Sequence, residues 1–141
     1  MSKSQLIFVV DDEPAIRDIL ESVLSDEGYP VITCQNSEVF YDQLEKKSPD
    51  LVLLDIWLPG TDGMAILSTL RETHPDLPVI MMSGHAGIDA AVNAIKKGAV
   101  DFMEKPLQLE ILLDKIAVVL SNKPPESIKD LASDTQMEVA R

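Results

Sequence analysis

Five short apolar runs alternate with segments of helical periodicity along most of this chain, and that alternation restricts the fold more than any other feature of the sequence. Three of these runs, residues 6–10, 51–54 and 79–82, are continuous and contain no polar residue. The other two cover residues 31–34 and 100–103. Continuous runs of this length are typical of strands that are buried on both faces, as in a parallel sheet. We therefore predict an α/β fold in which a parallel five-stranded sheet lies between two layers of helices.

Capping residues and periodicity indicate where the helices between these strands begin. Ser37 is expected to cap the second helix and Asp89 the fourth, because short polar side chains accept hydrogen bonds from the first free backbone N–H groups. In the fourth helix we expect Ala91, Val92 and Ile95 to face the core, since they recur at helical spacing. The first, second, third and fifth helices are predicted over residues 14–27, 37–47, 64–73 and 109–120.

Acidic residues, a serine and a lysine follow these runs at the same ends. Asp11 and Asp12 follow the first run, Asp55 the third, Ser83 the fourth and Lys105 the fifth. In parallel sheets, ligands bind beyond the carboxyl ends of the strands, so we expect these side chains to meet at one edge. Three carboxylates beside a lysine suit a divalent metal ion and a transferable phosphoryl group.

A carboxylate that attacks phosphorus must stay ionised close to the negative charge of the phosphoryl donor, and a bridging Mg²⁺ relieves that conflict. We expect Asp12 and Asp55 to bind Mg²⁺ directly and Asp11 to bind it through water. The backbone carbonyl of Trp57 is placed to complete the coordination shell. Without the metal ion, the three carboxylates would repel one another, so at least one of them should have a raised pKa.

Lys105 and Ser83 complete the predicted site. The lysine would neutralise one phosphoryl oxygen as a mobile point charge, and the serine hydroxyl would hydrogen-bond another. Taken singly, each of these residues has an ordinary explanation as a helix cap, a turn residue or a solvated charge. A common function explains better why all of them follow strands at the same edge.

Four motifs together resemble the receiver domain of two-component response regulators. They are VVDDE at residues 9–13, DIWLPGTDG at 55–63, SG at 83–84 and KP at 105–106. The resemblance covers roughly residues 4 to 121, and it is closest to receivers of the nitrogen-regulation (NtrC/NtrX-like) class of sigma-54 activators. It implies a flavodoxin-like (βα)5 three-layer sandwich with strand order 2-1-3-4-5.

Carried over position by position, the resemblance also implies the role of each site residue. It makes Asp55 the phosphoacceptor, Asp11 and Asp12 the acidic pair, Lys105 the phosphate-sensing lysine, Ser83 the switch hydroxyl and Phe102 the switch aromatic. Many receivers have Tyr at the Phe102 position, and Phe cannot hydrogen-bond through a phenol. The resemblance further implies Mg²⁺ as the cofactor and a cis peptide bond between Lys105 and Pro106.

The implied function is signalling, with no enzymatic activity beyond self-phosphorylation and self-dephosphorylation. A separate sensor histidine kinase would supply the phosphoryl group to Asp55. Phosphorylation of Asp55 would change the surface of the domain. This change would control the formation of a homodimer and the activity of an output domain that regulates transcription. We expect the homodimer to use the fourth helix, the fifth strand and the fifth helix, a face that carries Asp89, Asn93, Lys96, Lys97, Asp101 and Asp114.

Three other functions are compatible with parts of this pattern. A stand-alone receiver would act by protein–protein contact alone, and a pseudo-receiver would only scaffold other proteins, although the retained acidic residues and Lys105 weigh against the latter. A haloacid-dehalogenase-like phosphohydrolase also uses aspartate, magnesium and lysine on a parallel sheet. Such enzymes begin with Asp-x-Asp-x-Thr after the first strand, whereas DDE at residues 11–13 has a different spacing.

Composition excludes several partners. A net charge of -12 argues against direct binding of this segment to nucleic acid or to an anionic membrane, since both need clustered Lys and Arg. No apolar run approaches the roughly 18 residues of a membrane span, and the first residues have no signal-peptide pattern, so we expect a cytoplasmic location. The single cysteine, Cys34, allows no internal disulfide and is expected to be an inert core residue.

The amino-acid composition changes at residue 122, where a mostly polar segment that contains Pro124-Pro125 begins. Such a composition is typical of a linker. We therefore expect a receiver domain over residues 1–121 and a linker over 122–141 that leads toward an output domain. His85, two residues after Ser83, is expected to be exposed near the site.

Overall fold

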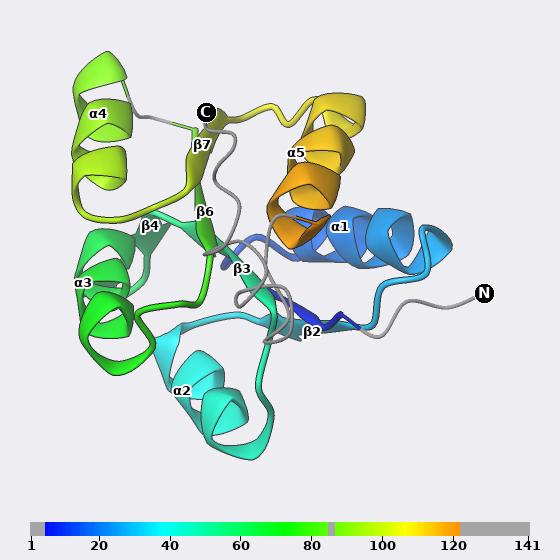
Figure 1. Cartoon of the computed structure of the whole chain (residues 1–141), viewed down its shortest axis with the longest axis horizontal. Coiled ribbons are helices and arrows are strands. Elements are labelled where there is room, and N and C mark those ends of the chain that lie inside the picture. Colours follow the sequence, from blue (N-terminus) through cyan, green and yellow to red (C-terminus); the bar gives the residue numbers. More distant parts are fainter. Residues whose placement is uncertain (1–4, 85–86, 122–141) are drawn as a thin grey trace, which may run out of the picture.

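A parallel five-stranded sheet forms the centre of the computed structural model, which describes residues 5–84 and 87–121 (Figure 1). The strands of this sheet are β1 (Ile7–Val10), β2 (Val31–Cys34), β3 (Leu51–Asp55), β6 (Val79–Ser83) and β7 (Asp101–Glu104). They lie in the order β2-β1-β3-β6-β7, and all neighbouring pairs are parallel. Since β6 and β7 are the fourth and fifth strands of the sheet along the chain, the predicted order 2-1-3-4-5 is confirmed.

Five helices cover the two faces of the sheet, which confirms the three-layer sandwich. They are α1 (Pro14–Asp26), α2 (Ser37–Lys46), α3 (Gly63–Thr73), α4 (Ile88–Lys96) and α5 (Leu109–Ser121). One core contains residues of α1 and α5, and the other contains residues of α2, α3 and α4. In Figure 1, α1 and α5 accordingly lie together on one side of the sheet.

The first strand shows why the apolar runs of this sequence are continuous. Phe8 and Val10 belong to the core under α2, α3 and α4, whereas Ile7 and Val9 belong to the core under α1 and α5. All four side chains are fully buried. Because successive side chains of a strand point to opposite faces, a strand covered on both faces needs an apolar residue at every position.

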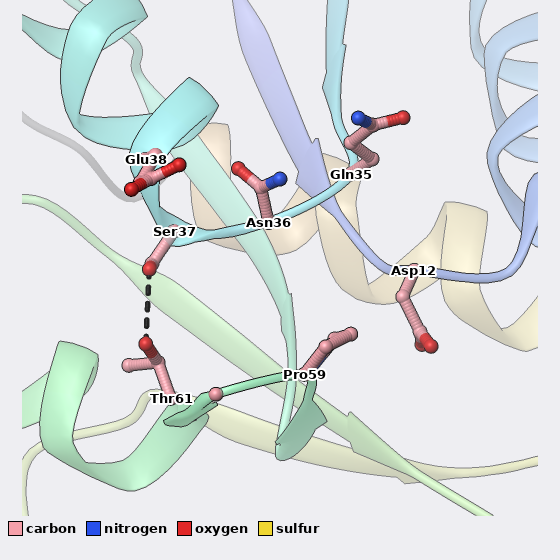
Figure 2. A pocket seen from close by; sticks show the side chains of 8 residues that line it. Asp12, Gln35, Asn36, Ser37, Glu38, Pro59 and Thr61 are labelled. Atoms are coloured by element: carbon pink, nitrogen blue, oxygen red, sulfur yellow. Dashed lines mark hydrogen bonds between the residues drawn. The ribbon is translucent and has the colours of Figure 1, made fainter.

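Two predicted helix caps are wrong by one or two residues. Asn36, and not Ser37, caps α2, because its Oδ1 accepts a hydrogen bond from the backbone N–H of Val39 at 2.8 Å. Ser37 is the first helical residue, and its hydroxyl hydrogen-bonds that of Thr61 at 3.0 Å (Figure 2). Gly87 precedes α4, and Asp89 lies inside the first turn. Adjacent polar residues offer similar caps, so the sequence does not distinguish them.

The predicted inner face of α4 is also wrong. Val92 and Ile95 are each 48% exposed and Ala91 is half-buried, whereas Ala94 is fully buried. The helix therefore approaches the core through small alanine side chains and leaves its larger apolar residues outside. The helical spacing of Val92 and Ile95 indicated an apolar face, but it could not show that a different face of the helix, which carries Ala94, packs against the core.

A short hairpin that was not predicted connects β3 to α3. Its strands are β4 (Trp57–Leu58) and β5 (Thr61–Asp62), which pair antiparallel around a turn in which Gly60 has a φ of 75°. The hairpin returns the chain so closely to β3 that a Cβ on Gly63 would lie 2.2 Å from the backbone oxygen of Asp55. The backbone N–H of Gly63 donates a hydrogen bond to the carbonyl of Ile56 at 2.7 Å. A glycine is therefore required where α3 begins.

Several smaller predictions are settled by the described residues. The Lys105–Pro106 peptide bond is cis, as predicted. Cys34 is buried, and that burial raises the pKa of its thiol to about 11, which agrees with an inert core residue. Within residues 5–84 and 87–121, no helix has the length and apolar character needed to cross a membrane. His85 and the predicted linker over 122–141 lie outside the described residues, so the domain boundary stays a prediction.

Candidate functional site

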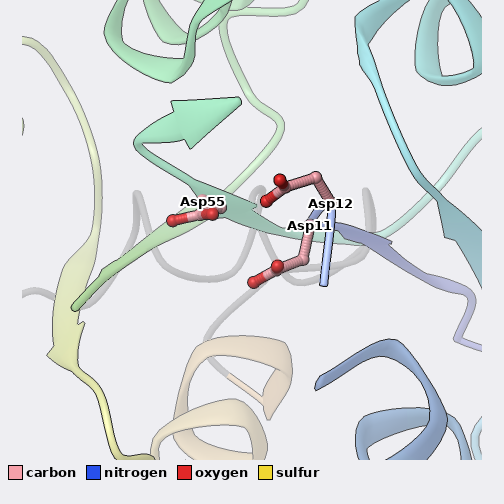
Figure 3. Close-up of side chains that lie close together, drawn as sticks. All are labelled: Asp11, Asp12 and Asp55. Atoms are coloured by element: carbon pink, nitrogen blue, oxygen red, sulfur yellow. The ribbon is translucent and has the colours of Figure 1, made fainter. Parts of the chain in front are cut away.

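The carboxyl ends of four strands bring the predicted site residues together. Asp11 and Asp12 directly follow β1, Asp55 ends β3, Ser83 ends β6 and Lys105 follows β7. Each of the three aspartates places a carboxylate oxygen within 4.8 Å of those of the other two. Figure 3 shows these three side chains close together. The expectation that these residues meet at one sheet edge is therefore confirmed.

The two residues of the acidic pair have different surroundings. Asp11 is fully buried, and its Oδ1 accepts a hydrogen bond from the backbone N–H of Glu13 at 2.9 Å. Its Oδ2 makes no hydrogen bond of good geometry, although Nζ of Lys105 lies 2.8 Å away and forms an ion pair with it. Asp12 is exposed and lines the open side of the site. The pair thus offers one buried and one accessible carboxylate.

Lys105 is surrounded by carboxylates. Its Nζ lies 2.8 Å from Oδ2 of Asp11, 2.8 Å from Oε1 of Glu13 and 3.5 Å from Oδ2 of Asp55. Burial by itself would lower the pKa of Lys105, but hydrogen bonds and charge attraction from these acids raise that pKa above its ordinary value. The ammonium group therefore stays protonated and neutralises part of the acidic cluster.

Glu13 is a member of the site to which the sequence reasoning assigned no role. Its carboxylate reaches Lys105 across the pocket, although the two residues are 92 positions apart in the chain. The available signal was the third acidic residue of the DDE motif, directly after the acidic pair. Glu13 directly precedes α1, but its side chain makes no capping hydrogen bond to that helix.

Asp55 has an unusual affinity for protons. Burial raises its pKa from 3.8 to about 6, and the negative charge of Asp11 contributes further in the same direction. Lys105 and the backbone N–H of Trp57, which lies 3.4 Å from Oδ1, oppose that rise. A raised pKa among the three aspartates was predicted, but its main cause is burial and not mutual repulsion.

Ser83 and Phe102 lie on adjacent strands and on the same face of the sheet. The register pairs Met81 with Phe102 and Ser83 with Glu104. Because Met81 and Ser83 are two residues apart, their side chains are on the same face of the sheet as Phe102. Ser83 is fully buried, and Phe102 is partly buried against the core under α2, α3 and α4.

The residues of this edge fit Mg²⁺. Hard oxygen ligands are what this ion prefers, and it commonly takes one or two carboxylates with the rest of its shell from water and phosphate. The buried Oδ2 of Asp11, which is paired with the ammonium group of Lys105, has a further lone pair that can accept a hydrogen bond from a water of such a shell. An open pocket of about 560 Å³ beside the cluster leaves room for a phosphoryl group, and it is lined by Asp12, Glu13, Ile16, Asp55, Trp57, Gly84, Lys105 and Pro106.

A second open pocket, of about 520 Å³, shares Asp12 with the first (Figure 2). It lies between the segment after β2 and the β4–β5 turn, and it is lined by Asp12, Gln35, Asn36, Ser37, Glu38, Pro59, Gly60 and Thr61. The hydrogen bond between Ser37 and Thr61 joins these two segments. This bond braces the hairpin that follows Asp55.

Comparison with known proteins gives consistent matches over nearly the whole described region. Residues 7–117 match the family described as the response regulator receiver domain. The nitrogen assimilation regulatory protein NtrX of Azorhizobium caulinodans is 39% identical over 125 residues, which is 87% of this chain and 26% of that protein. The chain thus spans about a quarter of the length of this curated relative.

Two solved structures are similar in both fold and sequence. The receiver domain of NtrX from Brucella abortus superposes with a TM-score of 0.78 at 43% identity, covering 82% of this chain and 98% of that one. The beryllofluoride-activated NtrC4 receiver domain dimer superposes with a TM-score of 0.80 at 34% identity, covering 84% and 98%.

Proposed function

Because the chain belongs to the response regulator receiver family, in its NtrX/NtrC-like group, we propose that it accepts a phosphoryl group on Asp55 from a partner sensor histidine kinase. One observation carries the proposal: Asp11, Asp12 and Asp55 gather their carboxylates within 4.8 Å, beside the ammonium group of Lys105. Receiver domains use Mg²⁺ at such an acidic pocket.

In the proposed reaction, an oxygen of Asp55 attacks phosphorus in line with the leaving group. The new O–P bond forms as the P–N bond of the kinase phosphohistidine breaks, and the bonding electrons pass to the imidazole nitrogen. Mg²⁺, when bound, offsets the repulsion between the carboxylate and the phosphoryl oxygens. Asp12 and Asp55 would bind it directly, Asp11 through water and Trp57 through its backbone carbonyl.

Lys105 and Ser83 would then recognise the phosphorylated state. The ammonium group of Lys105 lies near enough to Asp55, at 3.5 Å, to reach a phosphoryl oxygen after a small movement. Ser83 ends the neighbouring strand, and its hydroxyl would bond a second oxygen. If Ser83 is drawn toward the phosphoryl group, Phe102 on the same face of the sheet has room to move inward. The chain would thus act as a switch, with catalysis limited to its own phosphorylation and dephosphorylation.

We further propose that the switch controls an output domain that regulates transcription. Support comes from the NtrX relative, a nitrogen assimilation regulatory protein of which this chain matches about a quarter. A haloacid-dehalogenase-like phosphohydrolase is the alternative from a different class. Turnover of small phosphoesters by the purified chain would favour that alternative.

Incubation with acetyl phosphate tests the proposed function. We expect the intact mass to rise by one phosphoryl group when Mg²⁺ is present and to stay unchanged when the ion is removed with a chelator. The physical reason is that Lys105 offsets only part of the negative charge around Asp55, so the approach of an anionic phosphoryl donor requires a further cation. A chain that remains unlabelled with Mg²⁺, or that is labelled equally well without it, would contradict the proposal.

Phosphorylation is proposed to favour a homodimer through the face formed by α4, β7 and α5. The predicted charge pairing is weakened as an argument, because Asp101 already forms an ion pair with Lys115 of the same chain at 2.9 Å. Apolar side chains support the interface better. They are exposed on α4 at Ile88, Val92 and Ile95 and on α5 at Ile111 and Val118. The similar NtrC4 receiver forms a beryllofluoride-activated dimer.

Sedimentation with and without beryllofluoride, at tens of micromolar protein, measures this dimer, since interfaces of roughly 6 kcal/mol are populated in that range. We expect a shift from monomer toward dimer on activation, and we expect Ile95→Glu to prevent it by placing a charge in the interface. Ile19→Glu on α1 is a matched control, because Ile19 is similarly exposed, at 45%, on a helix outside this face. A monomer in both states, or equal effects of the two variants, would refute this interface.

A further inference from the structure

Glu13 adds a fourth carboxylate to the site beside Asp11, Asp12 and Asp55, and the proposed reaction assigns it no role. Its Oε1 and the Oδ2 of Asp11 each lie 2.8 Å from Nζ of Lys105, whereas the Oδ2 of Asp55 lies 3.5 Å away. The ammonium group is therefore closest to two carboxylates that do not receive the phosphoryl group. To contact a phosphoryl oxygen on Asp55, the ammonium group must move away from at least one of them.

The two nearer carboxylates differ in how easily they release the ammonium group. Asp11 is fully buried and fixed by two hydrogen bonds, one to its Oδ1 from the backbone N–H of Glu13 and one to its backbone oxygen from Arg17. The side chain of Glu13 is 58% exposed. Water therefore hydrates the Glu13 carboxylate readily once its ion pair opens, and an exposed pair of this kind is weak. Of the two, Glu13 is the partner that Lys105 exchanges at lower cost.

We propose that Glu13 is a positioning residue that holds Lys105 away from Asp55 in the unphosphorylated protein and competes with the phosphoryl group for the ammonium group of Lys105. The inference rests on the proposed function, because the competition exists only if Asp55 carries the phosphoryl group. On phosphorylation, Nζ leaves Oε1 of Glu13 and contacts a phosphoryl oxygen. Removal of the charge at position 13 should therefore strengthen the phosphorylated state, unlike removal of a residue that assists the reaction.

Glu13→Gln isolates this ion pair. The substitution keeps the length of the side chain, and it removes no helix cap because Glu13 makes no side-chain capping hydrogen bond at the start of α1. The full chain would be titrated with beryllofluoride at saturating Mg²⁺, with the fluorescence of Trp57 as the signal. Trp57 is the only tryptophan in the sequence, and it lines the same pocket. We expect the Kd for beryllofluoride to fall about two- to fivefold, the effect of one exposed ion pair.

Two further variants separate this contact from a general effect of charge. Glu104→Gln removes the same charge beside Lys105, yet Glu104 is exposed and takes part in none of the ion pairs among the described residues. Its Kd should equal that of the wild type. Glu13→Asp keeps the charge but shortens the reach by one methylene, so it should tighten binding as Glu13→Gln does.

The outcomes distinguish the two proposals. An unchanged or weaker affinity in Glu13→Gln, or an equal gain in Glu104→Gln, would overturn the role of Glu13 and leave the proposed function standing. A Glu13→Asp variant with the wild-type Kd would also overturn the role of Glu13. A negative charge at position 13 would then have its effect even when the side chain is too short to contact Lys105. If the wild-type chain binds no beryllofluoride, the proposed function and this inference fall together.

Discussion

Asp55→Asn is expected to abolish phosphorylation by acetyl phosphate. An amide oxygen has no negative charge with which to attack phosphorus. The side chain keeps its size, so the pocket should keep its shape. Intact mass after incubation with acetyl phosphate and Mg²⁺ measures the result, and the expected increase in mass is zero.

Asp62→Asn is a matched control for this experiment. Asp62 lies in the same connection between β3 and α3, and its Oδ1 accepts a hydrogen bond from the backbone N–H of Met64 as the cap of α3. Asn caps helices as well as Asp does, so this variant loses the same charge while the helix remains capped. It should be labelled as the wild type is. Labelling that persists in Asp55→Asn would assign the nucleophile to another residue, which peptide mapping would then identify.

Asp55→Asn is also expected to stabilise the metal-free protein at neutral pH, by up to about 3 kcal/mol. The pKa of Asp55 is raised from 3.8 to about 6 in the folded chain, and a difference of about two pH units corresponds to this free energy. Between these two pKa values the folded state binds the proton more tightly than the unfolded state. The stability contributed by Asp55 is therefore fully present below about pH 4, and it is lost as the pH rises through 6.

Urea unfolding at pH 5 and pH 7, with and without Mg²⁺, measures this effect. The metal-free wild type should lose more stability between the two pH values than Asp55→Asn does. Mg²⁺ should stabilise the wild type at pH 7 by mass action and should have a smaller effect on the variant. Equal pH dependence of the two proteins would show that burial of Asp55 is relieved in solution, against the geometry described here.

The fold was predictable because its main signal is simple. Strands covered on both faces need apolar residues at every position, as Ile7 to Val10 illustrate, and polar residues can then appear only where a strand ends. This is also why the sequence alone predicts that Asp11, Asp55 and Ser83 lie at one edge of the sheet. The order of strands and helices along the chain and the burial of the strands are sufficient to place these residues at one edge, and no side-chain contact has to be known.

The errors arose where side chains compete for similar positions. Asn36 and Ser37 are both good caps, and the choice between them depends on the contact of Ser37 with Thr61, which is 24 residues away. In α4, small and large apolar residues form adjacent stripes, and only the packing against the sheet shows that Ala94 faces inward. The contact between Glu13 and Lys105 depends on how far two flexible side chains extend, which no sequence pattern reports.

The close approach of Gly63 to Asp55 has a consequence for transplanting this site into another protein. A designer who copied only the three aspartates and Lys105 onto a different parallel sheet would omit a residue that touches no ligand. Any side chain at position 63 would meet the backbone oxygen of Asp55 and push Asp55 out of register with Asp11 and Asp12. The smallest segment to transfer therefore runs from Asp55 through the β4–β5 hairpin to the glycine at the start of α3.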